Sequence, residues 1–489
     1  MSYMSISSKE QKILDKNSAF FGVSLELLSE NAGEAVAEAV LQSPKIRPAA
    51  GKKAVVFAGI GNNGADALIT ARLLSEWVKT KIYVIAPETH KFSPLYTKAL
   101  DAVRSLCVFV KSPSDLPVDK PDIIIDGIFG TGFSGKPEGS YAQAIKWINS
   151  SRSFVVSIDL PSGVNADTGE FSLAVRADLT VTFHGEKPAF KLPKVKKLLG
   201  KLLVSDIGIP AKAVANVGPG DVEQAIKPRI GTEHKGDFGR VLVIGGNFMY
   251  KGAPALASMA VLRSGADIAY AVTPTGFCGM PDVIRFSLGS DFLTPADIPK
   301  ITPLLNKADV LLIGPGLGEE KDTVKAINDI LALLNGKPVV LDADALKAIK
   351  PDLLKKLKAI VTPHSKEFST LFGRKVPKDA ESASVLVKET AKKFNCTILF
   401  KGPVDIISDG SRVKLNEGGN ARMTVGGTGD VLAGLTAGFV AQSKDLFYSA
   451  CAAALVNRAA GDLLRKEKGY SYLASELLDA IPHVLKEYS

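Results

Sequence analysis

Cysteine and histidine are scarce in this sequence. The four cysteines, Cys107, Cys278, Cys396 and Cys451, are scattered, with no Cys-x-x-Cys pair and no histidine beside them, and the whole chain holds five histidines. This pattern excludes a disulfide framework and a structural zinc site. It fits a reducing cytoplasm, which is where we expect the protein.

Long hydrophobic runs are also missing. No apolar stretch reaches the roughly 18 residues that a membrane-spanning helix requires, and residues 1–22 lack the apolar core of a secretory signal, so we expect no membrane partner. The net charge of +9 suits anionic ligands. The densest basic run, residues 191–201, has no aromatic side chains between its lysines, which indicates a solvated surface and no nucleic-acid partner.

The length of 489 residues is too great for a single core and implies more than one domain. The hydrophobic fraction of 46% and the charged fraction of 23% are ordinary for a globular protein. Residues 209–231 are rich in proline, glycine and alanine, so we interpret them as a linker with a boundary near residue 215. This predicts domains at residues 1–214 and 215–489, and we expect the chain to form a homo-oligomer.

The most distinctive stretch lies near the C-terminus. Three glycines, Gly426, Gly427 and Gly429, surround Thr428 and lead directly to Asp430, and a run of small apolar residues then predicts a helix buried on all sides. The free N–H groups and the dipole of such a helix start can hold a phosphate. Asp430 could cap the helix, bind Mg²⁺ or accept a proton from an attacking hydroxyl. The pattern alone also fits a plain glycine turn with a capping aspartate.

The second half alternates strands and helices. Strands are predicted at residues 240–244, 269–273, 310–313, 338–341, 360–361 and 397–400, and each is followed by glycine or polar residues. His364 follows one of these strands in a Thr-Pro-His sequence. A functional role and a structural role for this histidine are about equally supported.

The first half contains a strand, a glycine turn, a helix and a strand, predicted at residues 54–58, 59–66, 67–78 and 81–86. Gly59, Gly61 and Gly64 spell the G-x-G-x-x-G of a dinucleotide-binding turn, and Glu88 lies where such folds place their ribose-binding acid. However, Asn62 and Asn63 occupy a turn that needs only backbone groups. Their amide side chains instead indicate a site in which side chains bind a ligand or a cation.

Two further predicted strands, residues 123–125 and 154–158, end in acidic, glycine-rich loops that begin with Asp126 and Asp159. In open α/β sheets, ligands bind beyond the carboxyl ends of the strands. Each acid alone could be a turn former or a helix cap. Together with the Asn62–Asn63 pair, they predict three strand ends that converge on one crevice.

The segments VVFAGIGNNGADALITARLL, DGIFGTGFSG and SIDLPSGVNADTG resemble the N-terminal domain of the NAD(P)H-hydrate epimerase family. The resemblance implies a Rossmann-like fold in which Asp159 is the acid–base residue at the substrate, and in which Asn63, Asp126 and Ser162 hold a potassium ion. It implies substrate contacts from two loops, made up of Asn62, Asn63, Gly64, Ala65 and Asp66, and of Gly130, Thr131, Gly132, Phe133, Ser134, Gly135 and Lys136. Ala65 and Ala67 replace family glycines, and their added methyl groups are expected to tighten the pocket.

The segments HKGDFGRVLVIGG, GAPALA, LLIGPGLG, VVLDADAL, VTPHSKEF and VGGTGDVLAG resemble the ADP- or ATP-dependent NAD(P)H-hydrate dehydratase family, which has a ribokinase-like fold. Both domains are therefore expected to be three-layer αβα sandwiches. The resemblance implies substrate contacts from Ala253, Gly316 or Gly318, His364 and Asp430. It implies nucleotide contacts from Lys401, Gly402, Pro403, Val404 and Asp405, and from Asn420, Thr424, Gly426, Gly427, Thr428 and Gly429.

Together the two resemblances imply the repair of hydrated NADH and NADPH. The first domain would interconvert the R and S forms at C6 of the nicotinamide ring. The second would use ADP, favoured over ATP, with Mg²⁺ to phosphorylate the C6 hydroxyl of the S form and eliminate phosphate. Two alternatives are a ribokinase-like small-molecule kinase with an accessory Rossmann-like binding domain, and a scaffold that only binds.

Overall fold

The computed structural model describes residues 5–86, 89–110, 112–117, 120–277 and 280–488, so Glu88 and Cys278 lie outside the described residues. The chain divides into two compact units, Met1–Ala213 and Val214–Ser489. Within the described ranges, no helix is both long enough and apolar enough to cross a membrane.

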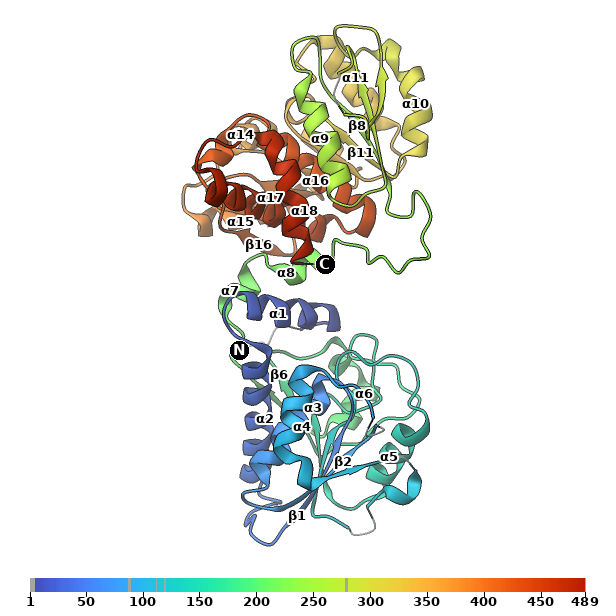
Figure 1. The fold of residues 1–489 in the computed structure, drawn as a ribbon, viewed down its shortest axis with the longest axis vertical. Helices are drawn as coiled ribbons and strands as arrows, with labels where there is room; N and C mark the ends of the chain where they lie inside the picture. Colours follow the sequence, from blue (N-terminus) through green and yellow to red (C-terminus); the bar gives the residue numbers. More distant parts are fainter. Residues whose placement is uncertain (1–4, 87–88, 111, 118–119, 278–279, 489) are drawn as a thin grey trace. The chain divides into compact units, whose positions relative to one another are not determined.

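The first unit is built on a seven-stranded parallel sheet with the order β3-β2-β1-β4-β5-β6-β7 (Figure 1). The strands are β1 Lys53–Ala58, β2 Lys79–Val84, β3 Cys107–Phe109, β4 Ile123–Gly127, β5 Phe154–Ile158, β6 Leu179–Phe183 and β7 Lys201–Ser205. The order reverses between β1 and β4, and the loops after these two strands therefore flank the crevice in which such sheets bind ligands.

Helices cover both faces of this sheet, as a parallel sheet requires. Figure 1 shows α2, α3 and α4 on one side and α5 on the other. The helices are α1 Ser8–Phe20, α2 Leu25–Gln42, α3 Asn62–Leu74, α4 Pro94–Val103, α5 Gly139–Ser150, α6 Pro193–Leu199 and α7 Ala211–Ala215, with 3₁₀ turns η1 Arg104–Leu106, η2 Pro113–Asp115 and η3 Pro188–Lys191.

The helix after β1 begins earlier than the sequence predicts. We expected it at residues 67–78, but α3 covers Asn62–Leu74, so both asparagines lie in its first turn. Gly61 is the N-cap, and its carbonyl accepts from the N–H groups of Gly64 and Ala65 at 3.0 and 3.1 Å. Gly59 packs so closely on the next loop that a Cβ there would lie 1.9 Å from the carbonyl oxygen of Ile128. Gly59 and Gly64 therefore serve close packing at the start of α3, since a Cβ on Gly64 would lie 2.0 Å from the Gly59 carbonyl oxygen.

The second unit has a nine-stranded sheet with the order β10-β9-β8-β11-β12-β13-β14-β15-β16. Its strands are β8 Arg240–Ile244, β9 Ile268–Thr273, β10 Ile284–Ser287, β11 Val310–Ile313, β12 Val339–Leu341, β13 Ala359–Val361, β14 Thr397–Phe400, β15 Asp405–Ser408 and β16 Val413–Asn416. The pairs from β10 to β14 are parallel, whereas β15 and β16 are added antiparallel. The order reverses again between β8 and β11.

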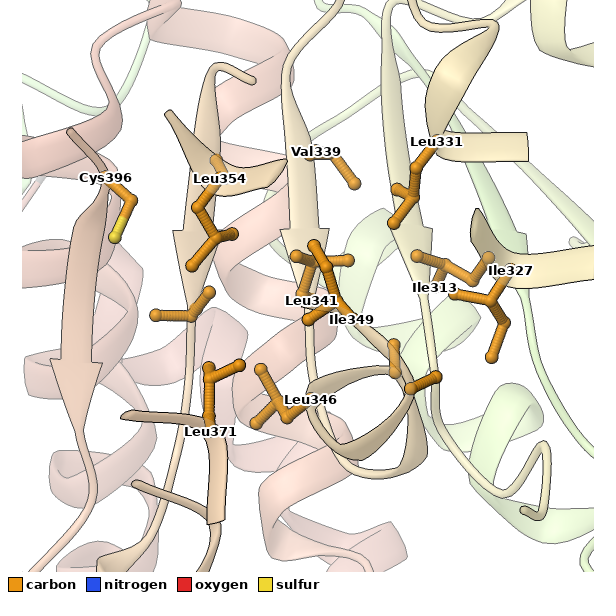
Figure 2. Packing of buried hydrophobic residues seen from close by; sticks show 14 of the residues in the cluster. Ile313, Ile327, Leu331, Val339, Leu341, Leu346, Ile349, Leu354, Leu371 and Cys396 are labelled. Atoms are coloured by element: carbon orange, nitrogen blue, oxygen red, sulfur yellow. The ribbon is translucent and has the colours of Figure 1, made fainter. Parts of the chain in front are cut away.

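One face of this sheet packs against α10, α11, α12, α14 and α15, and the other against α9, α16 and α17, with α18 on α9 and α17. Figure 2 shows part of the first core, where Ile313 and Leu341 of the sheet lie beside Ile327 and Leu331 of α11 and Leu346 of α12. The helices are α8 Pro219–Glu223, α9 Gly252–Arg263, α10 Ile298–Lys307, α11 Lys321–Ala332, α12 Asp344–Ala348, α13 Pro351–Leu354, α14 Ser365–Phe372, α15 Ala380–Phe394, α16 Thr428–Ser443, α17 Leu446–Lys468 and α18 Ala474–Lys486, with 3₁₀ turns η4 Pro295–Asp297 and η5 Ala421–Thr424.

The helix that follows the glycine turn is α16, and its residues from Val431 to Gln442 are all buried, as predicted. Its glycines let α9 approach. A Cβ on Gly434 would lie 2.1 Å from the carbonyl oxygen of Ala257, and one on Gly438 would lie 2.0 Å from Ser264 Oγ. Small residues thus allow α16 to sit in the middle of its layer.

The prediction of a linker over residues 209–231 is wrong for its central part. Asn216 forms a β-bridge with Leu415, and the fully buried carboxylate of Asp221 pairs with Lys414 Nζ at 3.1 Å. Asp221 also accepts from the N–H of Gly218 at 2.9 Å, which caps α8. Composition suggested a loose connection, but these contacts fix residues 216–223 in the second unit. The expected fold class, an αβα sandwich in each half, is confirmed.

Two candidate active sites

A pocket of about 620 Å³ opens at the carboxyl ends of β1, β4 and β5 in the first unit. The predicted residues that line it are Asn62, Asn63, Asp66, Gly130, Thr131, Gly132, Phe133, Ser134 and Asp159. The three strand ends therefore converge, because neighbouring parallel strands end at one edge of the sheet. Of the described residues with a predicted substrate role here, Gly64, Ala65, Gly135 and Lys136 do not line the pocket.

The replacement of family glycines by Ala65 and Ala67 does not narrow this pocket. Both alanines are fully buried, and neither is among the described lining residues. The Ala67 methyl lies against β4, only 2.4 Å from the position that a Cβ on Gly127 would take. The Ala67 methyl fills space between α3 and the sheet, and neither alanine lines the pocket, so the expected tightening is wrong.

Asp159 combines an unusual backbone conformation with a buried ion pair. Its φ is +64°, in the left-handed region that residues with a Cβ rarely adopt. Lys187, with 0% exposure, places Nζ 2.9 Å from Asp159 Oδ1, and Thr182 Oγ1 donates to the same oxygen at 3.0 Å. Sequence reasoning missed Lys187. Its only signal is a lysine in an otherwise ordinary loop, Gly-Glu-Lys-Pro.

Two more carboxyl groups line the same pocket. Burial raises the pKa of Asp66 to about 8, against a lowering hydrogen bond from Ser29. Burial also raises the pKa of Asp15, on α1, to about 6. Negative charge on Asp159 raises the pKa of both groups further. Asp15 was not predicted, because nothing in the pattern of residues 8–20 marks it.

The three predicted potassium ligands meet around the loop after β4. Asp126 is fully buried and accepts from Ser157 Oγ at 2.8 Å and from the N–H of Ser162 at 2.9 Å. Ser162 Oγ accepts from the N–H of Phe129 at 2.9 Å, and Asn63 Nδ2 donates to the Phe129 carbonyl at 3.0 Å. Burial raises the pKa of Asp126, although the serine hydrogen bonds oppose this.

This donor set is made of oxygen atoms and contains one carboxylate. Among the described residues, no group of three or more His, Cys, Asp or Glu side chains could hold a metal ion. A hard monovalent cation matches these atoms better than zinc or a tightly held divalent ion.

The second candidate site lies at the carboxyl ends of β12, β13 and β14 and at the start of α16. Gly427, with φ +98°, is the N-cap of α16, and Asp430 lies in its first turn, as predicted. Burial raises the pKa of Asp430 to about 7, and nearby Asp342 and Asp344 add to this while Lys401 opposes it. A carboxyl group with such a pKa can accept a proton near neutral pH.

Lys401 supplies positive charge beside the glycine turn. Its Nζ lies 2.8 Å from Asp342 Oδ1, 3.8 Å from Glu367 Oε2, and 3.6 Å from the position of a Cβ on Gly429. Burial lowers the pKa of Lys401, but the neighbouring carboxylates outweigh burial and raise it overall. The ammonium therefore stays charged at the place where the turn can hold a phosphoryl group. Asp342 and Glu367 were not predicted as site residues, although Asp342 follows a strand.

His364 combines structural and positional roles. Its Nδ1 accepts from the N–H groups of Lys366 and Glu367 at 3.1 and 3.2 Å, so the side chain caps α14. A β-bridge between His364 and Lys401 places it next to the charged cluster, and its imidazole is half exposed. A structural role and a functional role for His364 are therefore compatible.

The other predicted substrate residues lie at the switch point between β8 and β11. A Cβ on Gly316 would lie 3.3 Å from the Ala253 methyl, which places these two residues together. The N–H of Gly318 instead donates to Asp344 Oδ2 at 2.9 Å. Gly316 therefore lies beside Ala253, whereas the N–H of Gly318 is engaged by Asp344.

The predicted nucleotide segment after β14 is held by Arg458 of α17. Arg458 Nε and Nη2 lie 2.6 and 2.7 Å from the two carboxylate oxygens of Asp405. The guanidinium also donates to the carbonyls of Gly402 at 2.6 Å, Pro403 at 2.9 Å and Gly418. The buried Asp405 carboxylate is therefore occupied by Arg458, whereas Lys401, Gly402, Pro403 and Val404 remain predicted nucleotide contacts.

The second predicted nucleotide segment is held from the same helix. Asp462 accepts from the N–H of Gly419 at 2.8 Å and from Asn420 Nδ2 at 3.1 Å, and Tyr472 Oη donates to Asn420 Oδ1 at 2.9 Å. The hydroxyl groups of Thr424 and Thr428 donate to backbone carbonyls nearby. These side chains are engaged within the segment, so an anion at this turn would have to bind the backbone of Gly426, Gly427 and Gly429.

Comparison with known proteins finds a matching family model for each half of the chain. A model described as YjeF-related protein N-terminus matches residues 25–189, and one described as NAD(P)H-hydrate dehydratase matches residues 241–483. A bifunctional NAD(P)H-hydrate repair enzyme of Hyperthermus butylicus is 39% identical over 98% of this chain and 92% of its own, and one of Archaeoglobus fulgidus is 40% identical over 98% of each. Among solved structures, an ADP/ATP-dependent NAD(P)H-hydrate dehydratase from Bacillus subtilis is 25% identical and covers 56% of this chain and 99% of its own, with a TM-score of 0.45. From the full-length identities, the chain belongs to the family of bifunctional NAD(P)H-hydrate repair enzymes.

Proposed function

We propose that this chain repairs hydrated NADH and NADPH, with one reaction in each unit. The first unit interconverts the R and S forms at C6, and the second dehydrates the S form with a nucleotide, ADP being favoured over ATP. The observation that carries the proposal is the presence, in one chain of this family, of an acid-lined pocket around Asp159 and of a glycine turn that leads into Asp430.

In the first unit, the reacting carbon carries both a hydroxyl group and the ring nitrogen. Its configuration is lost when the C6–N1 bond opens to an aldehyde and is set again when the ring closes. Asp159 is the base for this step because it lines the pocket. Lys187 and Thr182 fix its Oδ1, and the second carboxylate oxygen accepts the proton.

Asn63, Asp126 and Ser162, with the Phe129 carbonyl, would hold a potassium ion next to this pocket. The chemistry of the donor set fits, because all the atoms are oxygen and one carries charge. When bound, the ion supplies positive charge near the substrate phosphates. Through their hydrogen bonds, these residues join the loops after β1, β4 and β5 and so stabilise the part of the site next to Asp159.

In the second unit, hydroxide is a poor leaving group, and phosphorylation of the C6 hydroxyl overcomes this. Asp430 accepts the hydroxyl proton, and the amides at Gly427–Gly429 with Lys401 Nζ stabilise the transferring phosphoryl group. Phosphate then leaves from C6 as a proton leaves C5, which restores the C5–C6 double bond of NAD(P)H.

Magnesium would arrive with the nucleotide. Asp342 and Asp344 offer carboxylates beside Asp430, and one or two carboxylates plus phosphate oxygens are the usual surroundings of this ion. When bound, magnesium neutralises charge on the nucleotide phosphates.

The test is to incubate the protein with hydrated NADH and either ADP or ATP and to follow the near-ultraviolet absorbance of the dihydronicotinamide ring. Recovery of this absorbance from a mixture of epimers, beyond the amount of S form supplied, requires both reactions. A simple kinase would instead accumulate a phosphorylated product without recovery, and a scaffold would leave the substrate unchanged.

A further inference from the structure

One wall of the epimerase pocket is α1, which precedes the residues matched by the N-terminal family model. Gln11, Lys12 and Asp15 of α1 line the pocket. Residues at these spacings lie on one side of a helix, so α1 presents a single polar face to the cavity. The mechanism above uses none of these three side chains.

The helix is well anchored to the rest of its unit. Ser8 donates to the Asp167 carboxylate from its N–H at 2.9 Å, and the buried Asn17 side chain donates to the Ala213 carbonyl at 3.3 Å. Ile13 and Leu14 are buried, at 3% and 7% exposure. These contacts give Asp15 a fixed place at the pocket wall.

Asp15 and Asp159 have contrasting surroundings. Asp159 is paired with an ammonium group, whereas Asp15 accepts a hydrogen bond from the neutral amide of Gln11 at 2.8 Å. Burial raises the pKa of Asp15 to about 6, the Asp159 carboxylate adds to this, and Lys187 opposes it. Two acids in one pocket with such different environments are suited to opposite roles in proton transfer.

We propose that Asp15 is the proton donor of the epimerase reaction, acting opposite the base Asp159. The proposal rests on the epimerase activity proposed above and adds a residue to it. It is carried by the position of α1 at the pocket wall and by the different partners of the two carboxyl groups.

The proton balance of the step is complete with these two groups. Asp159 takes the proton of the C6 hydroxyl, the C6–O bond becomes a carbonyl, and the electron pair of the breaking C6–N1 bond stays on N1. Asp15 gives its proton to N1. After rotation about C5–C6, N1 attacks the other face of C6, Asp15 recovers its proton and Asp159 returns its own to the oxygen. No oxidant, reductant or further reactant is needed.

Asp66 of α3 is the competing donor, because its carboxyl group also lines the pocket. However, its Oδ1 is closed off from solvent and has no hydrogen-bond partner among the described residues. A group that must give and recover a proton in each turnover needs an open path to the substrate, which this oxygen of Asp66 lacks. Among the charged groups, Asp159 raises the pKa of Asp15 and Lys187 lowers it, and Asp15 in turn raises the pKa of Asp66.

The full chain without nucleotide tests the proposal, because dehydration then cannot start. Purified R epimer is converted by wild type, Asp15→Asn, Asp15→Glu, Asp66→Asn and Lys16→Ala across a range of pH, and the epimers are separated by chromatography. Lys16 is the matched control, since it is the exposed neighbour of Asp15 and does not line the pocket. Circular dichroism and thermal melting of a fragment that ends at Ala213 report whether each variant of the first unit is folded, and dehydration of purified S epimer with ADP reports that the second unit is unaffected.

We expect Asp15→Asn to lower kcat about 10²–10⁴-fold with little change in KM. The kcat of Asp15→Glu should be at least about tenfold higher than that of Asp15→Asn. Wild-type activity should fall as pH rises above about 6, and this decline should shift in Asp15→Glu. Lys16→Ala should match wild type.

Three results overturn the proposal: a kcat in Asp15→Asn within about twofold of wild type, a loss that Asp15→Glu does not recover, or a loss confined to Asp66→Asn. If Asp15→Asn does not fold, the pH profile of Asp15→Glu decides, and an unshifted decline overturns the proposal. A wild-type chain that does not interconvert the epimers overturns the epimerase function itself, and this proposal with it.

Discussion

Arg458 and Asp405 form a two-point ion pair, with Nε 2.6 Å from Oδ2 and Nη2 2.7 Å from Oδ1. Both side chains are nearly buried, at 12% and 7% exposure. Arg458 thereby ties α17 to the segment after β14 and, through the Gly418 carbonyl, to the segment after β16. One arginine thus holds both stretches that we assign to the nucleotide.

Arg458→Lys should weaken nucleotide use. Lysine keeps the charge but lacks the planar fork that bonds both carboxylate oxygens and the neighbouring carbonyls. We expect the KM for ADP or ATP to rise about tenfold or more, while epimerisation without nucleotide stays at the wild-type rate. An unchanged nucleotide KM would show that these segments hold their shape without the arginine.

Asp430→Asn should remove most dehydratase turnover and leave nucleotide binding nearly intact. Loss of a general base typically costs about 10²–10⁴ in rate. Steady-state rates on the S epimer and nucleotide binding by calorimetry measure the two effects. A variant that keeps more than about half of wild-type turnover would reduce Asp430 to a helix cap.

The same substitution has a stability signature that separates the two roles. Burial raises the pKa of Asp430 to about 7, so the folded state binds the proton more tightly than the unfolded state. The stability that this group contributes is present at low pH and is lost as the pH rises through about 7. Asp430→Asn should therefore melt at a higher temperature than wild type at pH 8, and the difference should shrink toward pH 4. A variant that melts lower at pH 8 would instead indicate lost capping.

Lys187→Met should impair epimerisation. The substitution leaves Asp159 Oδ1 with Thr182 but without its ammonium partner, so the carboxylate loses one of the two groups that fix its position. We expect kcat to fall with little change in KM, because the substrate-binding residues are unchanged. Lys187→Arg, which keeps the charge and the donor, should recover part of the activity. A kcat in Lys187→Met equal to that of wild type would argue against a positioning role for Lys187.

Epimerisation should depend on potassium. Titration of KCl against a non-coordinating organic salt at constant ionic strength should raise the rate until it saturates. Asp126→Asn should weaken this response, because the site loses its one carboxylate, while dehydration of the S epimer is unchanged. Indifference to potassium, or loss of activity with a chelator of divalent ions, would refute the assignment.

A fragment that ends at Ala213 should fold and interconvert the epimers without a nucleotide. The first unit has its own sheet with both faces covered, and the contacts of Asn216 and Asp221 belong to the second unit. Circular dichroism and the chromatographic assay test the two parts of this expectation. An insoluble fragment would mean that the first unit needs the rest of the chain to fold.

The sequence alone located the ends of the strands and therefore the edges at which the sites lie. Predicted strands at residues 154–158, 240–244, 310–313 and 397–400 coincide with β5, β8, β11 and β14. Runs of apolar residues bounded by glycine and acids are local patterns, and parallel strands bring their ends to one edge by geometry. The sequence predicts the grouping of Asn63, Asp126 and Asp159 from this rule alone.

Tertiary structure alone decided the partners of the acids. Lys187 reaches Asp159, Asp15 reaches the same pocket from α1, and Arg458 reaches Asp405 from α17. Hydrophobic periodicity says which face of a helix is buried, but it does not say against which distant segment a polar side chain packs. The charge state of Asp430 and the burial of Lys187 are consequences of that packing, because desolvation and neighbouring charges exist only once the chain has folded.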